Sequence, residues 1–149
     1  MLRAGALLTA GGTTLPLTGC DLFDRAEPTP PPDPLEPLAG ESRELAARHR
    51  AAVAADPGLA DRLTPIADAH AAHAEEIQRL IGRPAPSGSP APSATGPAAD
   101  RDGLLAGLRE AEQRGRESAA KACVAAPGER AAVLGSIAAA RVTHVEVLR

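Results

Sequence analysis

The sequence of 149 residues predicts an all-α protein, a four-helix bundle made of two helical hairpins. Apolar residues recur every three or four positions in four segments, which is the spacing of one face of an α-helix. No segment alternates apolar and polar residues with a period of two, so no strand is expected. Residues 83–99 are rich in Pro, Ser, Gly and Ala, and we expect them to form a long flexible crossover between the two hairpins.

The first helix is predicted from Pro34 to about Ala55. Asp33 is a typical capping residue, and Pro34 suits the first helical position because an amide hydrogen would have no intrahelical partner there. Glu36 lies at the third helical position, where its side chain can bond back to the cap. The folded domain is therefore expected to span residues 34–149.

The second helix is predicted to open at Asp56 and Pro57, which repeat the combination of a cap and a proline. Gly82 is expected to end it, since glycine readily adopts the left-handed conformation found after a helix. Pro65 lies inside this helix and is expected to bend it, because its nitrogen cannot bond back to the preceding turn.

The second hairpin follows the linker. Asp100 or Asp102 is expected to cap a third helix over residues 103–124, and Pro127 and Gly128 to open a fourth helix that continues to the last residues. With these elements in place, each hairpin has two helices joined by a short turn, and only the link between hairpins is long.

A segment of a different kind precedes the bundle. Residues 4–17 are moderately apolar and shorter than the ~20 residues that a membrane-spanning helix needs. The segment closes with Leu17-Thr18-Gly19-Cys20, an aliphatic residue, two small ones and a cysteine, which resembles a bacterial lipobox. The resemblance implies that residues 1–19 are a removable lipoprotein signal peptide and that the Cys20 thiol carries a diacylglyceryl group. It also implies a protein anchored to the extracytoplasmic face of the cell membrane by its lipid.

Residues 20–33 are polar and then rich in proline, which favours an extended polyproline II tether between anchor and bundle. Nucleic acid is not an expected partner, because the net charge is −3, Tyr and Trp are missing, and Phe23 is the one aromatic residue. If Cys20 carries lipid, Cys123 has no partner for a disulfide, and we expect it to act as a small buried hydrophobic residue.

The two hairpins are related by an internal repeat. The segment 66–75 matches 137–146 at a constant offset of 71 residues, with Ile, Ala, His and Glu at equivalent positions. Two similar hairpins joined by one long crossover have the connectivity of ferritin-like four-helix bundles. With its lipobox, its Pro-Pro-Pro-Asp-Pro-Leu tether, Leu-Ala-Ala-Arg in the first helix and Ala-His-Ala-Ala-His in the second, the chain resembles the actinobacterial ferritin-like lipoproteins of unknown function.

All four histidines fall on the predicted inner faces of the helices. The inner stripes comprise Leu45, His49 and Ala52 in the first helix; Leu59, Leu63, Ile66, His70, His73, Ile77 and Leu80 in the second; Leu105, Leu108, Glu112, Gly115 and Ala119 in the third; and Leu134, Ile137, Arg141, His144 and Leu148 in the fourth. Buried polar groups need partners, so these stripes predict a polar cluster inside the bundle.

Two arrangements would satisfy that cluster. In the first, His70, His73, His144 and Glu112 ligate a metal such as Zn or Fe, with Glu76 continuing the spacing of the histidine pair by three more residues. In the second, the groups form a structural network that also includes His49 and Arg141, with Arg141 paired to Glu112 and no cofactor.

The sequence favours the structural network. Di-iron ferritin-like proteins carry Glu three residues before His on two helices, whereas this chain has His70 and Arg141 at those positions. A permanent cation in place of a carboxylate opposes binding of two metal ions. We therefore expect a lipoprotein that is not an enzyme and that binds or scaffolds an unidentified protein partner. A metal-binding or redox bundle, and a bundle that dimerises through an Ala-rich face, remain the alternatives.

Overall fold

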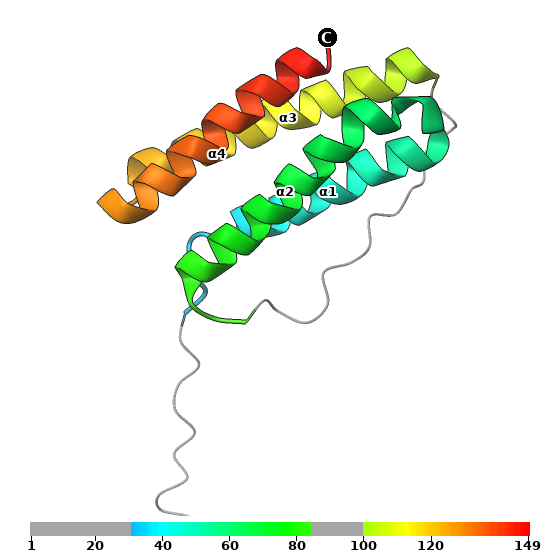
Figure 1. Cartoon of the computed structure of the whole chain (residues 1–149). Coiled ribbons are helices and arrows are strands. Elements are labelled where there is room, and N and C mark those ends of the chain that lie inside the picture. The colour runs from blue at the N-terminus through cyan, green and yellow to red at the C-terminus, as the bar shows by residue number, and fades with distance from the viewer. Residues whose placement is uncertain (1–30, 85–99) are drawn as a thin grey trace, which may run out of the picture. The chain divides into compact units, whose positions relative to one another are not determined.

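The computed structural model describes residues 31–84 and 100–149, and this part of the chain is entirely helical, without strands (Figure 1). The elements are α1 (Glu36–Ala55), a short 3-10 helix η1 (Pro57–Leu59), α2 (Ala60–Ile81), α3 (Arg101–Ala125) and α4 (Gly128–Val147). The prediction of an all-α chain with four α-helices is confirmed. The predicted signal peptide, Cys20, most of the tether and most of the linker lie outside the described residues.

The helix starts differ from the sequence prediction by one to three residues, for reasons that the caps show. The Oδ1 atom of Asp33 accepts a hydrogen bond from the Leu35 amide at 2.9 Å, so Pro34 and Leu35 form a turn before α1 begins at Glu36. Asp56 caps η1 through the Gly58 amide, which delays α2 to Ala60. Both shifts follow a proline, which fixes a turn ahead of the regular helix.

The other helix signals act as predicted. Asp100, and not Asp102, caps α3 by accepting from the Gly103 amide at 2.8 Å. Gly82 ends α2 with a φ of 72°, the left-handed conformation that glycine adopts without a steric penalty. Pro65 lies within α2, which runs from Ala60 to Ile81, and the bend expected at this residue stays a prediction.

Contacts at the helix ends define the direction of each helix. Arg101 at the start of α3 pairs with Asp56 before α2, with Nε and Oδ2 2.7 Å apart. Arg83 after α2 pairs with Glu36 at the start of α1. Residues 84 and 100 therefore lie at opposite ends of the bundle. It follows that α2 and α3 run in the same direction, while each hairpin is antiparallel (Figure 1).

The interior consists of a polar layer between two apolar clusters. One cluster comprises Leu35, Leu38, Ala39, Ile77, Ile81, Ala119, Leu134 and Ile137. The other comprises Ala52, Leu59, Leu63, Ile66, Leu105, Leu108 and Leu148. The buried polar side chains between them are Ser42, His49, His70, Glu112, Arg141 and His144. The apolar clusters supply the hydrophobic driving force, at about 1.5–3 kcal/mol for each fully buried Leu or Ile.

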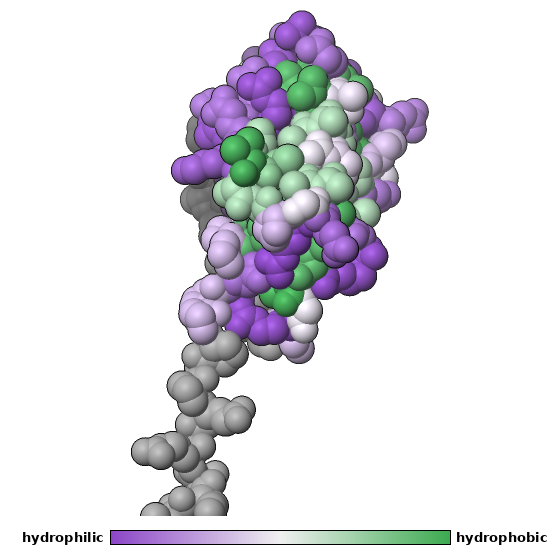
Figure 2. Space-filling view, turned by 90° about the vertical axis from the view of Figure 1, so that its left-hand side faces the viewer, coloured by the Kyte–Doolittle hydropathy of each residue, from purple (hydrophilic) through white to green (hydrophobic). Residues whose placement is uncertain are grey.

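One face of the bundle carries an apolar region. Figure 2 shows hydrophobic residues gathered on the side where α3 leads into α4, bordered by hydrophilic ones. Val124, near the end of α3, is 90% exposed. Its neighbour Cys123 is only partly buried; it packs against the first apolar cluster, and its Sγ donates to the Ala131 carbonyl. Among the described helices, none has the length and apolarity that crossing a bilayer requires.

Candidate metal centre

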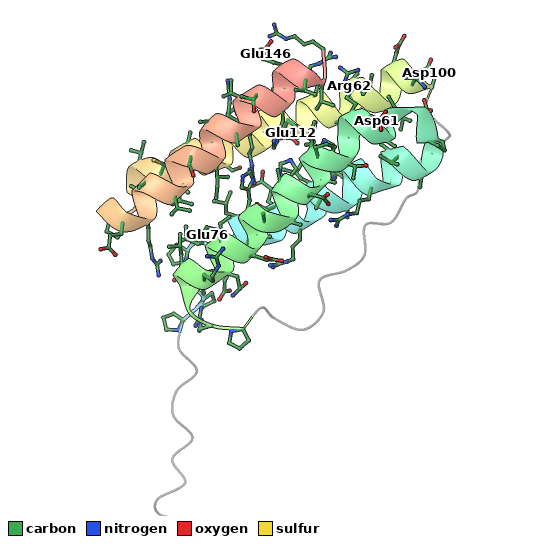
Figure 3. The ribbon with its side chains drawn as sticks, in the orientation of Figure 1. Asp61, Arg62, Glu76, Asp100, Glu112 and Glu146 are labelled. Carbon is green, nitrogen blue, oxygen red and sulfur yellow. The ribbon has the colours of Figure 1, made fainter. Side chains whose placement is uncertain are left out.

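Four helices each contribute one buried side chain to the centre of the polar layer. His49 comes from α1, His70 from α2, Glu112 from α3 and His144 from α4. Helical spacing brings them inward, because each continues an apolar stripe at intervals of three or four residues. Figure 3 shows Glu112 in the interior between the helices, and its side chain is fully buried.

The Glu112 carboxylate is surrounded by imidazoles. Its Oε1 atom lies 2.5 Å from Nε2 of His70 and 3.5 Å from Nε2 of His49. Its Oε2 atom lies 3.5 Å from Nδ1 of His144 and has no hydrogen-bond partner among the described residues. The carboxylate can accept several hydrogen bonds, but it receives only one among the described residues, from His70.

A ring nitrogen of His49 that carries no hydrogen faces this carboxylate. Its Nδ1 lies 2.9 Å from the Leu45 carbonyl oxygen, which can only accept, so Nδ1 carries the hydrogen. In the neutral ring Nε2 then has a lone pair and no hydrogen. That lone pair faces the negative Oε1 atom, and Nε2 has no hydrogen-bond partner in the described part of the chain. Two acceptors that face each other in this way need a cation or a proton between them.

His49, His70 and Glu112 have the separations that a metal site requires. One ligand atom from each lies within 4.8 Å of the others, and all three side chains are buried. Two imidazole nitrogens and a carboxylate oxygen suit Zn or Fe. The bond from His49 to Leu45 is a typical support for a metal-ligating histidine, because it fixes the tautomer and the ring orientation.

Burial and mutual proximity shift the pKa values of this cluster. Burial lowers the pKa of His49 and of His70, and this effect outweighs the attraction of Glu112 for their protonated forms. For Glu112, burial favours the neutral acid, but His144 and His70 outweigh it and bring the pKa to about 2. The centre therefore favours neutral imidazoles around an ionised carboxylate, which are the protonation states that metal ions bind.

Arg141 does not pair with Glu112, which corrects the structural network expected from the sequence. Its Nη1 atom donates to the Gly115 carbonyl at 2.5 Å and to Oε1 of Glu41 at 3.2 Å, and its Nη2 atom donates to Oγ of Ser42 at 2.8 Å. The guanidinium is fully buried. Because its charge is already paired with Glu41, no fixed cation among the described residues neutralises Glu112.

The remaining predicted residues lie further from the centre. His73 is only half-buried, and its ring centroid is 5.8 Å from that of His70 and 6.3 Å from that of His144. Glu76 pairs with Arg79 at the surface, away from Glu112 (Figure 3). His49, which the sequence placed only in the network, is the residue that completes the close set. Leu45 precedes His49 by four residues, and this helical spacing is the sequence signal for the bond between the Leu45 carbonyl and the His49 ring.

Comparison with known proteins found no matching family model, no similar curated protein and no similar solved structure.

Acid is expected to destabilise the metal-free bundle. Burial, with contributions from His70 and Arg141, lowers the pKa of His73 from 6.5 to about 4. The folded state then binds fewer protons than the unfolded chain, so this contribution to stability is complete above pH 6.5 and is lost as pH falls toward 4. For His73 the loss amounts to at most about 3 kcal/mol. Denaturant titrations with a chelator at about pH 7.5 and about pH 4.5 measure it.

The low pKa of Glu112 acts in the same direction at more acidic pH, between about 4.5 and 2. A His73→Asn variant serves as the control and should show a smaller difference between the two pH values of the titrations. Equal unfolding free energies for the unaltered chain at those two pH values would contradict the prediction.

Proposed function

We propose that this chain is a lipid-anchored, extracytoplasmic metal-binding protein whose bundle holds one transition-metal ion of the Zn or Fe class. The observation that carries the proposal is the fully buried Glu112 carboxylate, which faces a bare imidazole nitrogen of His49 and lies 2.5 Å from His70. A divalent cation would neutralise the carboxylate and give Nε2 of His49 a partner at once.

A structural network without metal is the weaker interpretation. It needs a cation for Glu112, and Arg141 bonds instead to Glu41, Ser42 and Gly115. Leaving a charged carboxylate buried with one hydrogen bond costs several kcal/mol. A metal ion removes that cost, with His144 as the nearest additional donor. A centre enclosed by protein ligands is typical of binding and structural sites, whereas catalytic sites keep an open position.

The arrangement of helices supports a ferritin-like bundle. The two hairpins are antiparallel, and α2 ends at the opposite end of the bundle from the start of α3, which agrees with the single long crossover that is typical of that fold. In such bundles metal sites lie at the centre, and side chains from facing helices build them. The position of Glu112 and the histidines between two apolar clusters agrees with that plan.

A metal titration tests the function. The purified chain, stripped with a chelator, is expected to bind one equivalent of Zn²⁺ or Co²⁺, and bound Co²⁺ should give the visible absorption of a low-coordinate N/O site. A double variant, His49→Ala with His70→Ala, should lose both signals because it removes two of the three closest ligands. A chain that binds neither ion, or a double variant that binds as well as the parent, would refute the proposal.

The anchor rests on the lipobox-like Leu17-Thr18-Gly19-Cys20. Two acyl chains, at ~0.8 kcal/mol for each buried CH₂, hold a protein stably on a bilayer, whereas one chain does not. Replacing Cys20 by Ser is expected to move the protein from the detergent phase to the aqueous phase after phase separation with a nonionic detergent. Cys123→Ser is the matched control and should stay in the detergent phase. A Cys20→Ser protein that still partitions with detergent would rule out this anchor.

A further inference from the structure

The internal repeat extends to the polar layer itself. The offset of 71 residues that relates α2 to α4 also separates Glu41 in α1 from Glu112 in α3. The same offset relates His70 to Arg141 and His73 to His144. Each of these three positions of one hairpin therefore has an equivalent position in the other hairpin.

One contact between the hairpins obeys the same symmetry. His70 of α2 contacts Glu112 of α3, and the equivalent Arg141 of α4 contacts the equivalent Glu41 of α1. The layer thus contains two related half-sites. The first half-site is Glu112, His70 and His144. The second half-site is Glu41 and Arg141, which are in contact, together with His73, which the offset of 71 residues assigns to it. In both, the last-named histidine has a buried Nδ1 atom without a hydrogen-bond partner among the described residues.

The second half-site already holds a cation. The Arg141 guanidinium is fully buried and donates to Glu41, Ser42 and the Gly115 carbonyl. Gly115 makes room for it, since a Cβ atom there would lie 2.7 Å from Nη1 of Arg141 and 2.7 Å from Oε1 of Glu41. The guanidinium stays charged at any pH at which the protein is folded.

We propose that the second half-site is a latent metal position in which the Arg141 guanidinium takes the place of a metal ion, so that the bundle binds one metal ion and not two. The inference rests on the proposed metal site, which shares Glu112 and His70 with the first half-site and also includes His49. It assigns Glu41 and His73 as the ligands that a second ion would meet if Arg141 were replaced by a side chain that can ligate. The layer then has two cation positions, one exchangeable and one built into the chain.

The experiment converts the second half-site to the composition of the first. Arg141→His places an imidazole at the position equivalent to His70, and we expect the variant to bind two equivalents of Zn²⁺ or Co²⁺ where the unaltered chain binds one. Arg141→Met is the matched control, because it removes the charge without adding a ligand, and it should still bind one. Adding Glu41→Gln to Arg141→His should return the stoichiometry to one.

The outcomes separate this inference from the proposed function. One equivalent in both the unaltered chain and a folded Arg141→His variant overturns the inference and leaves the proposed site intact. No metal in the unaltered chain but one equivalent in Arg141→His overturns the proposed function and supports the latent position. If Arg141→His does not fold, the metal affinity of the single variant Glu41→Gln tests the inference instead. A loss of metal affinity above about 100-fold would make Glu41 a ligand of the native ion and refute the inference, whereas a smaller change supports it.

Discussion

Replacing Glu112 by Gln is expected to lower the affinity of the chain for Zn²⁺ by about 100-fold or more, since even residues that only support a ligand contribute about 10–100-fold. Gln has nearly the same shape, so the change removes the negative charge and leaves the packing of the layer in place. The Glu112 carboxylate approaches His49, His70 and His144 together. Isothermal titration calorimetry with Zn²⁺ measures the effect directly.

Thermal unfolding provides a second measurement of the same variant. A ligand present at about 100 times its Kd stabilises a folded protein by about 2.7 kcal/mol, and the unaltered chain should show this gain when Zn²⁺ is added. Glu112→Gln should lose the gain. Glu110→Gln is the matched control, because Glu110 lies on the same helix but pairs with Arg114 at the surface. If Glu112→Gln and Glu110→Gln respond equally to Zn²⁺, Glu112 is not a ligand.

Replacing Gly115 by Ala is expected to destabilise the bundle by about 1–3 kcal/mol, the usual cost of inserting a methyl group into a packed interior. The new Cβ would lie 2.7 Å from the Arg141 guanidinium, 2.7 Å from Glu41 and 3.1 Å from Leu45. Glu41 is 28% exposed and can move outward. Arg141 cannot, because it is fully buried and its Nη1 atom bonds to the carbonyl of Gly115 itself.

Gly115→Ala is informative because its expected effect on stability is opposite in sign to that of a Gly→Ala change in an exposed helix. In an exposed helix, Gly to Ala adds about 0.5–1 kcal/mol of stability. Gly107 lies on the same helix, is exposed and has no atom within 4 Å of the place that a Cβ would take, so Gly107→Ala should stabilise the bundle by that amount. Denaturant midpoints of the two variants should therefore move in opposite directions. Two midpoints that both rise would show that Arg141 is not held as described.

The helices could be predicted because their signals are local. Asp33, Asp56, Asp100 and Gly82 act through amides and carbonyls within three or four residues, and the sequence displays each of them. The exact starts could not be predicted, because whether a proline opens a helix or a preceding turn depends on how the next residues pack. Periodicity likewise predicts which face of each helix is buried, and the inner positions of His49, His70, Glu112, Arg141 and His144 follow from it.

The pairing inside the layer could not be predicted from periodicity. A stripe places a residue on a face, but the height and rotation of neighbouring helices decide which stripe residues meet. For this reason the stripes favour a pair between Arg141 and Glu112, whereas the structure pairs Arg141 with Glu41, an acidic residue that no stripe includes. Periodicity also puts His73 inside with His70, although it lies at the edge of the layer. The repeat offset between Glu41 and Glu112 is the one sequence signal for the true pairing.

The enclosure of the centre between two apolar ends has a kinetic consequence. His49, His70 and Glu112 have no exposed surface, so a bound ion can leave only while the helices transiently separate. Such opening events cost much of the global unfolding free energy when they expose a core. Release should then be slow at moderate temperature, accelerate steeply on warming and follow the deuterium uptake of the amides around Glu112. The residence time of a bound ion would then depend on how often the helices separate, and not on the strength of the metal–ligand bonds alone.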